Sequence, residues 1–271
     1  MVNVSVVLYK NSLEEIERLI DCLLPVKNIK NIFLINNSPK EFDVDFSKTK
    51  KKSSKIIYIL NPVNSGYGAA NNIAIKRSLD DGLLYHLVLN PDVFFDFGVI
   101  DELFNYMNLN QDVGMIRPKV LNTDSSIQNN ARLLPSPLDL ISRRLGYNFH
   151  TKLENAISNS KKELNIPFLS GCFMFLRVSI IEKVGMFDEN IFLYMEDLDL
   201  SRRINAESKT LHYPFNNIFH EEQLKSRFNI MHFVMHLKSA IYYFNKWGWY
   251  KDKLREELNQ KALKGILESC E

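Results

Sequence analysis

Tyr85-His-Leu-Val-Leu-Asn-Pro-Asp-Val93 is the stretch of sequence that decides the fold of this chain. Its apolar run ends abruptly at Asn90. Pro91 lacks the N–H group that a central strand must donate, so we expect the strand to stop there. Asp92 then supplies a carboxylate at the carboxyl end of a buried strand. Because open α/β sheets bind their ligands at that edge, Asp92 is the first candidate for a functional residue.

Short strands alternate with helices on both sides of this stretch. We predict strands at Val2–Leu8, Ile32–Ile35, Ile56–Leu60, Leu84–Leu89 and Val113–Pro118. A capping box at Ser12–Glu15 opens a helix directly after the first strand. This alternation predicts an α/β fold with a Rossmann-like, mostly parallel central sheet flanked by helices.

The second half of the chain has a less regular pattern. Residues 122–165 are polar, and we predict a long loop with one helix there. Phe168–Arg177 is predicted as a single apolar strand, Val178–Val184 as a short helix and Leu198–Ala206 as another helix. From about residue 228 onward the pattern becomes helical and aromatic. We therefore expect a main domain over residues 1–225 and a C-terminal, aromatic-rich helical extension over residues 226–271.

The composition is that of a soluble globular protein. With 271 residues, 45% of them hydrophobic and 24% charged, the chain can bury a large core. A net charge of +2 is too small to indicate nucleic-acid binding, and the basic run Lys48–Lys55 is interpreted as a solvated loop. The three cysteines are widely spaced, which disfavours a zinc site or a disulfide framework. No signal peptide or spanning segment is evident, so we expect a cytoplasmic protein.

A glycine-containing turn follows the third predicted strand. It places Asn64, Gly66, Gly68 and Asn71 at the start of a helix. Glycines let a backbone approach a ligand, and the free N–H groups of a helix start suit a phosphate. The third glycine of the dinucleotide fingerprint and the lysine of a P-loop are both missing. A turn that binds nothing therefore stays an alternative here, as an Asx turn does for Asp92.

A second acidic cluster, Glu196-Asp-Leu-Asp199, follows another aromatic-aliphatic run. Two separated acidic sites favour one carboxylate for a metal and another for general base work. Hard divalent cations prefer oxygen ligands, and a base must reach an acceptor hydroxyl. The structural alternative is a well-capped helix in which Asp199 pairs with Arg203 one turn later.

His220 and the C-terminal region also have two interpretations each. His220 follows a short apolar stretch, where a histidine is either a structural residue or a metal ligand. The C-terminal region combines apolar residues at helical spacing with tyrosines, tryptophans and lysines. Aromatic residues with lysines suit a helix at a membrane interface, whereas a helix docked on the domain's own core shows the same pattern.

Together, these segments resemble the family 2 inverting glycosyltransferases with the GT-A fold. They look most like the bacterial rhamnosyltransferases of O-antigen and cell-wall polysaccharide assembly. The matching segments are Val4–Tyr9, Asn36-Asn37-Ser38, Asn64–Asn72, Leu89–Val93, Ser170–Met174, Gly185–Glu189, Phe192–Arg203 and His220. One departure concerns the metal. Asn90 stands where the first Asp of an Asp-x-Asp motif is expected, which leaves fewer protein ligands.

The resemblance implies a role for each matching residue. Asp92 and His220 would hold Mg²⁺ or Mn²⁺, Asp197 would be the catalytic base, and Glu196 would position the acceptor or the base. The nucleotide sugar would be bound by Leu8, Tyr9, Asn36, Asn37, Asn64, Gly66, Gly68, Asn71, Asn90 and Asp92. The acceptor side would be formed by Ser170, Gly171 and Cys172.

The implied activity is transfer of L-rhamnose from dTDP-β-L-rhamnose, with inversion, to a glycan on a polyprenyl diphosphate. That acceptor implies a place at the inner face of the plasma membrane, with peripheral contact through the C-terminal helices. Two alternatives stay open: a UDP- or GDP-sugar donor, and a non-catalytic sugar-nucleotide-binding assembly subunit. A nucleotidyltransferase is disfavoured, because Tyr9–Leu13 contains no glycine-rich loop after the first strand.

Overall fold

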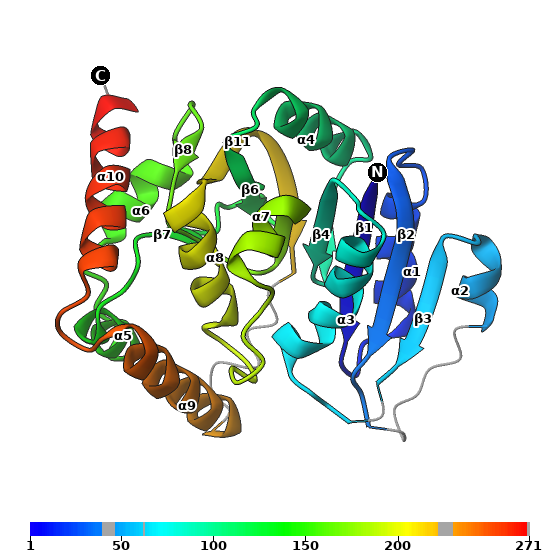
Figure 1. Ribbon diagram of the computed structural model, residues 1–271, viewed down its shortest axis with the longest axis horizontal. Helices are drawn as coiled ribbons and strands as arrows, with labels where there is room; N and C mark the ends of the chain where they lie inside the picture. Colours follow the sequence, from blue (N-terminus) through cyan, green and yellow to red (C-terminus); the bar gives the residue numbers. More distant parts are fainter. Residues whose placement is uncertain (40–46, 62, 222–229, 270–271) are drawn as a thin grey trace.

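The computed structural model describes residues 1–39, 47–61, 63–221 and 230–269 and is built around a mostly parallel sheet (Figure 1). Within these ranges the sheet has nine strands, in the order β3–β2–β1–β4–β10–β6–β11–β5 with β8 paired to β11. The strands are β1 (Val2–Leu8), β2 (Ile29–Asn36), β3 (Ile56–Leu60), β4 (Tyr85–Leu89), β5 (Val93–Phe94), β6 (Val113–Leu121), β8 (Leu164–Asn165), β10 (Phe173–Arg177) and β11 (Lys209–His220).

The strand directions confirm the predicted fold class. β3, β2, β1 and β4 are parallel, and β11 is parallel to β6. β10 is antiparallel to both β4 and β6, and β5 is antiparallel to β11. All seven residues of β1 are buried, because helices cover both faces of the sheet. A strand buried on both faces must be apolar throughout, as the sequence of β1 nearly is.

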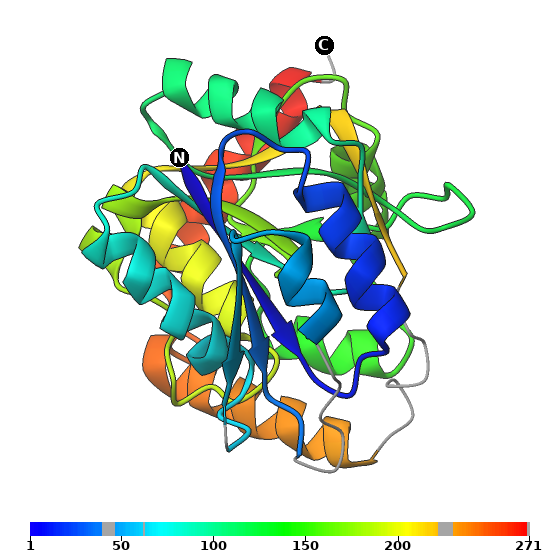
Figure 2. The same cartoon turned by 90° about the vertical axis from the view of Figure 1, so that its right-hand side faces the viewer.

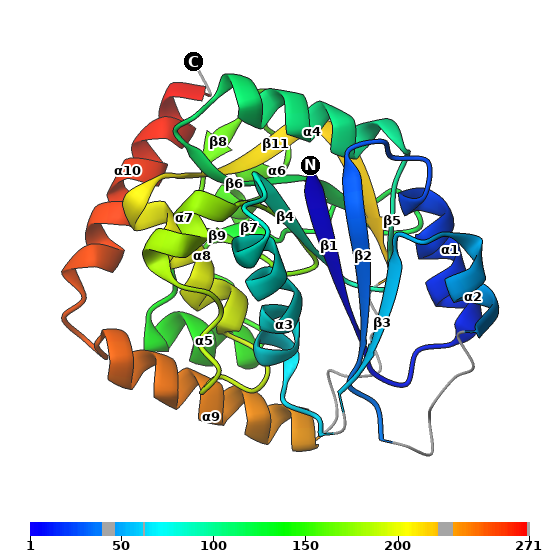
Figure 3. The same ribbon diagram turned by 45° about the vertical axis from the view of Figure 1, so that its right-hand side comes forward.

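Different helices cover the two faces of the sheet. The flanking helices are α1 (Leu13–Leu23), α2 (Ser47–Lys52), α3 (Tyr67–Asp80), α4 (Gly98–Leu109), α7 (Val178–Val184) and α8 (Glu196–Glu207). Ile16 of α1 and Leu103 of α4 belong to one core cluster, whereas Ile75 of α3, Ile181 of α7 and Leu200 of α8 belong to another. Figures 2 and 3 show α1 and α3 on opposite sides of β1–β3. The core is therefore two apolar layers separated by the sheet.

The prediction of one strand over Phe168–Arg177 is wrong. The structure divides it into β9 (Phe168–Leu169) and β10, and β9 pairs with β7 (Ala131–Arg132) in a separate two-stranded sheet. Between them, Gly171 N donates to the Asp197 carboxylate at 2.8 Å instead of to a neighbouring strand. A side-chain acceptor from a distant helix thus interrupts the ladder, and local hydrophobicity cannot reveal that interruption.

The prediction of one helix within residues 122–165 is also wrong. The segment contains α5 (Pro137–Arg144) and α6 (Thr151–Ser158). α5 begins with a capping box between Ser136 and Asp139, and Pro137 occupies its first turn, where a missing N–H costs nothing. The basic run Lys48–Lys55 is likewise not only loop, since it contains most of α2.

The C-terminal region forms α9 (Ile230–Trp247) and α10 (Lys253–Ser269), which pack against α8. Arg202 of α8 is 1% exposed and forms an ion pair with Asp252, just before α10. The hydroxyl oxygen of Tyr243 on α9 accepts a hydrogen bond from the Arg202 guanidinium at 3.2 Å. Among the described helices, none has the length and apolar content needed to span a bilayer. The division at residue 225 stays a prediction.

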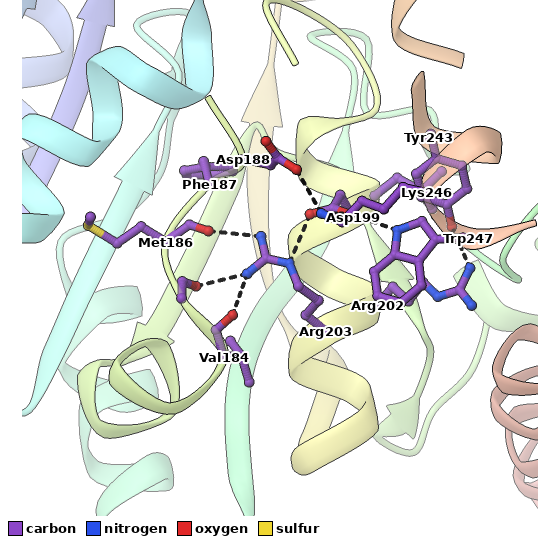
Figure 4. A network of polar contacts seen from close by, with 12 residues as sticks. Val184, Met186, Phe187, Asp188, Asp199, Arg202, Arg203, Tyr243, Lys246 and Trp247 are labelled. Carbon is purple, nitrogen blue, oxygen red and sulfur yellow. Dashed lines mark hydrogen bonds and ion pairs between the residues drawn. The ribbon is translucent and has the colours of Figure 1, made fainter. Parts of the chain in front are cut away.

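Asp199 and Arg203 form the centre of a second network, drawn in Figure 4. Arg203 Nε donates to Asp199 Oδ2 at 2.8 Å, which confirms the predicted pair one helical turn apart. The rest of the Arg203 guanidinium donates to the carbonyl groups of residues 184–186. The other Asp199 oxygen accepts from Trp247 Nε1 at 2.8 Å and from Lys246 Nζ at 2.9 Å. Arg203 therefore fixes the loop before α8, and Asp199 fixes α9 to α8.

We expect Asp252→Ala to lower the free energy of unfolding by about 3 kcal/mol, because it leaves the Arg202 cation buried without its counter-ion. Urea denaturation followed by circular dichroism measures the change. The control is Glu268→Ala, which removes an exposed pair with Lys264 at 3.8 Å and should change stability by less than about 0.5 kcal/mol. Equal effects of the two substitutions would contradict the role given to Asp252.

Candidate active site

The site lies at the carboxyl ends of β1, β2 and β4, where the apolar strands give way to asparagines and acids. Leu8, the last residue of β1, is buried, and Tyr9 beyond it is 49% exposed. Asn36 ends β2, and its side chain is occupied by Tyr58 Oη at 2.8 Å and by the backbone of Ser38 at 2.9 Å. Among these three predicted nucleotide-binding residues, Tyr9 offers the most accessible surface.

Asparagines join the loops that follow β2 and β3. Asn37 Nδ2 donates to Asn64 Oδ1 at 3.0 Å and to Gly66 O at 3.1 Å. Asn61 Nδ2 donates to Asn37 Oδ1 at 2.6 Å. The structure thus brings Asn37, Asn64 and Gly66 together, as expected of one binding region. Their amide groups hold the two loops to each other.

The two glycines of the turn have packing roles. Gly66 has φ of +90°, which favours glycine, and a side chain there would collide with the carbonyl of Phe192. A Cβ at Gly68 would lie 2.9 Å from Phe187 Cβ. Asn71 is fully buried within α3 and accepts from Ser5 Oγ at 2.6 Å. These residues therefore dock α3 against β1 and the loop before α8, which places the start of α3 beside the acidic cluster.

Asp92 and His220 meet although they are far apart in the sequence. The short strand β5 pairs with the end of β11, so that His220 lies opposite Val93 and His220 Nε2 lies 3.4 Å from Asp92 Oδ1. His220 Nδ1 is 3.1 Å from the amide oxygen Oε1 of Gln128, and because that oxygen is an acceptor, Nδ1 is the donor of this hydrogen bond. Nε2 faces the carboxylate, which is the arrangement of a metal-ligating histidine whose other nitrogen is held by a second partner.

The donor set fits a divalent cation. Asp92 Oδ1 is buried and has no hydrogen-bond partner among the described residues. A buried carboxylate oxygen without a partner is costly unless a ligand satisfies it. In the described part of the chain, no group of three or more His, Cys, Asp or Glu side chains is placed to hold a metal ion. Asp92 and His220 would therefore hold Mg²⁺ or Mn²⁺ only with oxygen atoms from a ligand, such as a diphosphate.

Asp197 lies in the first turn of α8 and is held in one orientation. Its Oδ2 accepts from Gly171 N at 2.8 Å, and its Oδ1 accepts from Leu198 N at 2.8 Å. Burial raises the pKa of Asp197, while these backbone hydrogen bonds oppose the rise. The helix N-terminus also favours the ionised form. Each carboxylate oxygen retains a lone pair with which to accept a further proton donor.

Glu196 is buried beside Asp197 and differs from it in its partners. Its Oε2 has no hydrogen-bond partner among the described residues. Burial and the neighbouring Asp197 charge raise the pKa of Glu196 well above its usual range. Two adjacent buried carboxyl groups resist double ionisation, so one of them stays protonated at a higher pH than the other. A carboxyl group of this kind can accept or donate a hydrogen bond to a bound hydroxyl.

The backbone before these acids is strained. Tyr194 has φ of +66° and Met195 has φ of +69°, a left-handed conformation that costs non-glycine residues about 1 kcal/mol or more each. Tyr194 Oη is 2.8 Å from His232 Nδ1 on α9, which helps to hold the turn. The two consecutive left-handed residues start α8 abruptly, so that Glu196 and Asp197 follow directly from the loop.

The Ser170–Cys172 turn joins the metal side to the acidic side. Cys172 O accepts from Asn90 N at 2.9 Å, next to Asp92. Gly171 N holds Asp197, and a Cβ at Gly171 would lie 3.1 Å from Asp197 Cβ. Ser170 Oγ lies 3.6 Å from the buried Cys172 sulfur. The three residues predicted for the acceptor side thus position Asp197 relative to β4.

Two residues of the site were missed in the sequence. Tyr67 Oη is 2.8 Å from Asn90 Oδ1 and 3.0 Å from Gly171 O, and burial raises its pKa well above the usual range. Arg117 is 1% exposed and donates to Ser170 Oγ at 2.7 Å, and its charge opposes the rise of the Asp197 pKa. A charged residue inside the apolar strand β6 was the available signal for Arg117.

Several curated proteins are similar to this chain in sequence. The chain is 28% identical over 212 residues to the N-acetylglucosaminyl-diphospho-decaprenol L-rhamnosyltransferase of Mycobacterium tuberculosis, covering 71% of this chain and 68% of that protein. It is 29% identical over 188 residues to the rhamnosyltransferase WbbL of Escherichia coli K12, covering 66% and 69%. It is 27% identical over 190 residues to the low-salt glycan biosynthesis hexosyltransferase Agl10 of Haloferax volcanii, covering 67% and 59%.

Solved structures share the GT-A fold. The crystal structure of GalNAc-T7 with UDP, GalNAc and Mn²⁺ superposes with a TM-score of 0.65 at 15% identity; it covers 98% of this chain, which spans only 56% of that one. A crystal structure of S. aureus TarS superposes with a TM-score of 0.60 at 13% identity, covering 98% and 72%. The family model for glycosyl transferase family 2 matches residues 5–185. Because this match covers most of the chain, the protein belongs to glycosyl transferase family 2.

Proposed function

We propose that this family 2 glycosyltransferase is a metal-dependent, inverting rhamnosyltransferase. Its donor would be dTDP-β-L-rhamnose, and its acceptor would be a hydroxyl of a lipid-linked glycan in bacterial surface polysaccharide synthesis. One observation carries the proposal: the Ser170–Cys172 turn bonds both to the loop of Asp92 and to the carboxylate of Asp197. A cation site and a buried base are thereby held on two sides of one binding region. The rhamnosyltransferase names of two relatives support the donor.

The donor half of the reaction depends on the loops after β1, β2 and β3. We assign the nucleotide to the region of Tyr9, Asn37 and Asn64, and the diphosphate to the neighbourhood of Asp92. Asp92 Oδ1 and His220 Nε2 would hold a divalent cation, which when bound supplies positive charge opposite the departing nucleoside diphosphate. Gln128 fixes the His220 ring, so that Nε2 is already directed at Asp92.

The acceptor half depends on the acidic pair. Asp197 would take the proton of the acceptor hydroxyl as its oxygen attacks the anomeric carbon from the face opposite the leaving group. A single displacement inverts that carbon, so a β-linked donor gives an α-L-rhamnoside. The N–H groups of Gly171 and Leu198 keep the carboxylate oriented. Glu196, with a free buried oxygen, would orient the acceptor through a second hydrogen bond.

The main competing function is glycosyl transfer from a different nucleotide-sugar donor. The described side chains near the site do not by their chemistry select one base or one sugar of the donor. One relative is named only as a hexosyltransferase. A UDP- or GDP-sugar would be accommodated by the same acidic pair and the same cation site. A non-catalytic sugar-nucleotide-binding subunit is the second competitor, and it leaves the buried base Asp197 without a purpose.

The acceptor also determines where the protein works. The mycobacterial relative is named for a decaprenol-linked substrate. A polyprenyl-diphosphate acceptor lies in a membrane, and nucleotide sugars are made in the cytoplasm. We therefore place this protein in the cytoplasm, at the inner face of the plasma membrane.

The first test is thermal unfolding with dTDP, UDP or GDP, each with and without Mn²⁺. A ligand that binds only the folded state stabilises it, by about 2.7 kcal/mol at a concentration of 100 Kd. We expect the largest rise in Tm with dTDP and Mn²⁺ together. A larger rise in Tm with UDP or GDP would indicate a UDP- or GDP-sugar as the donor. No rise with any nucleotide would count against glycosyltransferase activity itself.

Asp197→Asn should fold normally and lose transfer by about 100-fold or more, because the amide cannot take up the acceptor proton. Initial rates with the preferred donor measure this, and the exposed substitution Asp80→Asn is the control. In the wild type, the rate should fall as the pH drops through the Asp197 pKa. Since burial raises that pKa, the fall should begin at a higher pH than for an exposed aspartate. Full activity of Asp197→Asn would refute the role of Asp197 as the catalytic base.

Asp92→Ala and His220→Ala should both abolish the Mn²⁺-dependent part of the nucleotide-induced rise in Tm. The metal-independent part should be smaller but present, because the nucleoside contacts remain. Gln128→Ala is the matched probe of orientation and should weaken Mn²⁺ binding by about 10-fold to 100-fold. An unchanged Mn²⁺ response in Asp92→Ala would remove this residue from the cation site.

A further inference from the structure

Exposed apolar side chains concentrate in two segments of the chain. They lie on α5 and the turn after it, and on the first two thirds of α9. The members are Leu138, Ile141, Leu145, Tyr147, Phe149, Ile230, Met231, Phe233, Val234, Leu237 and Ile241. Leu145, Phe149 and Ile230 are 69%, 74% and 80% exposed. Soluble proteins seldom expose so many large apolar side chains together unless the surface binds something.

The two segments form one surface, which we call the α5–α9 face. The Arg144 guanidinium lies 4.7 Å from the centre of the Phe233 ring. Leu140 of α5 packs into the same apolar cluster as Tyr243 of α9. α9 has a separate buried side, formed by Ser239, Ala240, Tyr243 and Phe244, which rests on the domain. The exposed apolar residues of α9 are therefore not on the side that docks on the core. The expected docking of this helix on the domain accounts for one side of it only.

The charged residues of the α5–α9 face are mostly basic. α9 contains no aspartate or glutamate along its whole length. Arg143 of this face forms an ion pair with the buried Glu154, which leaves Arg144, Lys152 and Lys238 as its further basic residues across residues 138–152 and 230–241. Asp139 is the one acidic residue in these two ranges. Asp139 is partly buried and is occupied by the N-terminal cap of α5 and by His150. Apolar residues among cations, with the one carboxylate engaged in hydrogen bonds within the protein, complement a surface of anionic lipid headgroups.

The α5–α9 face also lies at the functional end of the molecule. In Figures 1 and 3, α5 and α9 lie at the lower end, toward which the arrowheads of β1, β2 and β3 point. His232 of α9 lies 2.8 Å from Tyr194 Oη, and Tyr194 comes two residues before Glu196. A bilayer under this face would therefore border the acidic pair, where the acceptor is expected.

We propose that the α5–α9 face rests on an anionic lipid bilayer, with its apolar side chains inserted at the headgroup level. The inference deepens the proposed use of a lipid-linked acceptor, since it specifies the surface that brings the acidic pair to the membrane. α5 and the turn at residues 145–149 contribute exposed apolar residues to this surface, as α9 does. The binding surface is discontinuous in the sequence and exists only in the folded chain.

Vesicle flotation with the full chain tests the proposal. Vesicles of phosphatidylcholine alone are compared with vesicles that contain phosphatidylglycerol as well. We expect binding to the anionic vesicles, weakened by salt. The variant Leu145→Ser/Phe149→Ser/Ile230→Ser/Leu237→Ser should raise the apparent Kd at least about tenfold, because apolar contact area is lost. Arg144→Gln/Lys238→Gln should weaken binding to the anionic vesicles alone.

The matched control is Leu84→Ser/Phe97→Ser/Leu109→Ser/Leu267→Ser, which removes four exposed apolar side chains elsewhere on the surface. It should bind vesicles like the wild type. An equal loss in this control, or no binding of the wild type to either vesicle, would overturn the proposal. So would light scattering that shows a dimer of the wild type and a monomer of the α5–α9 variant, because the face would then bind a second copy of the chain.

Transfer to a soluble acceptor separates this inference from the proposed function. The α5–α9 variant should retain wild-type rates with such an acceptor while it loses vesicle binding. Retained transfer by a wild type that does not bind vesicles would refute the bilayer surface alone. Vesicle binding by a wild type that transfers no sugar would refute the proposed function and leave the surface intact.

Discussion

The hydrogen bond from Gly171 N to the Asp197 carboxylate is the interaction on which the geometry of the site depends. It interrupts what would otherwise be a continuous strand from β9 to β10 and ties the start of α8 to the centre of the sheet. The same turn accepts a hydrogen bond from Asn90 at the end of β4. One three-residue segment therefore sets the position of the acidic pair relative to Asp92, with Arg117 buried beneath it as a support.

The acidic pair is placed at some cost in stability. Two carboxyl groups are buried next to each other, and two left-handed residues precede them. Each feature is unfavourable alone, and the surroundings offset both: the helix N-terminus and two backbone N–H groups favour the ionised Asp197, and the hydrogen bond between Tyr194 and His232 holds the turn. Strain and buried charge that persist at the edge of a sheet are typical of a site built for chemistry rather than for stability.

The C-terminal helices connect the site to the exposed surface of the protein. Asp199 and Arg202, on the α8 helix that begins with the acidic pair, hold α9 and the start of α10 through Trp247, Lys246 and Asp252. α9 therefore packs as part of the folded unit and supports the turn before Glu196, while its other side remains exposed and apolar. The surface that we propose to bind a bilayer and the histidine that holds the turn before the acids thus lie on the same helix.

The sequence by itself determined the parallel strands β1–β4 and the positions of α1 and α3, because local periodicity, caps and prolines specify those elements. It did not give α2, β5 or α4. β1, β3 and α7 have the predicted bounds, and Asp92 and the acidic cluster at Glu196 were visible as breaks in apolar runs. Only the tertiary structure decided which of these residues meet. His220 reaches Asp92 through the pairing of β5 with β11, Gly171 leaves its strand for Asp197, and Tyr67 and Arg117 join the site from α3 and β6. It also decided that α5 and α9 share one face. These contacts join segments distant along the chain, and their energies depend on burial and partners that no local pattern contains.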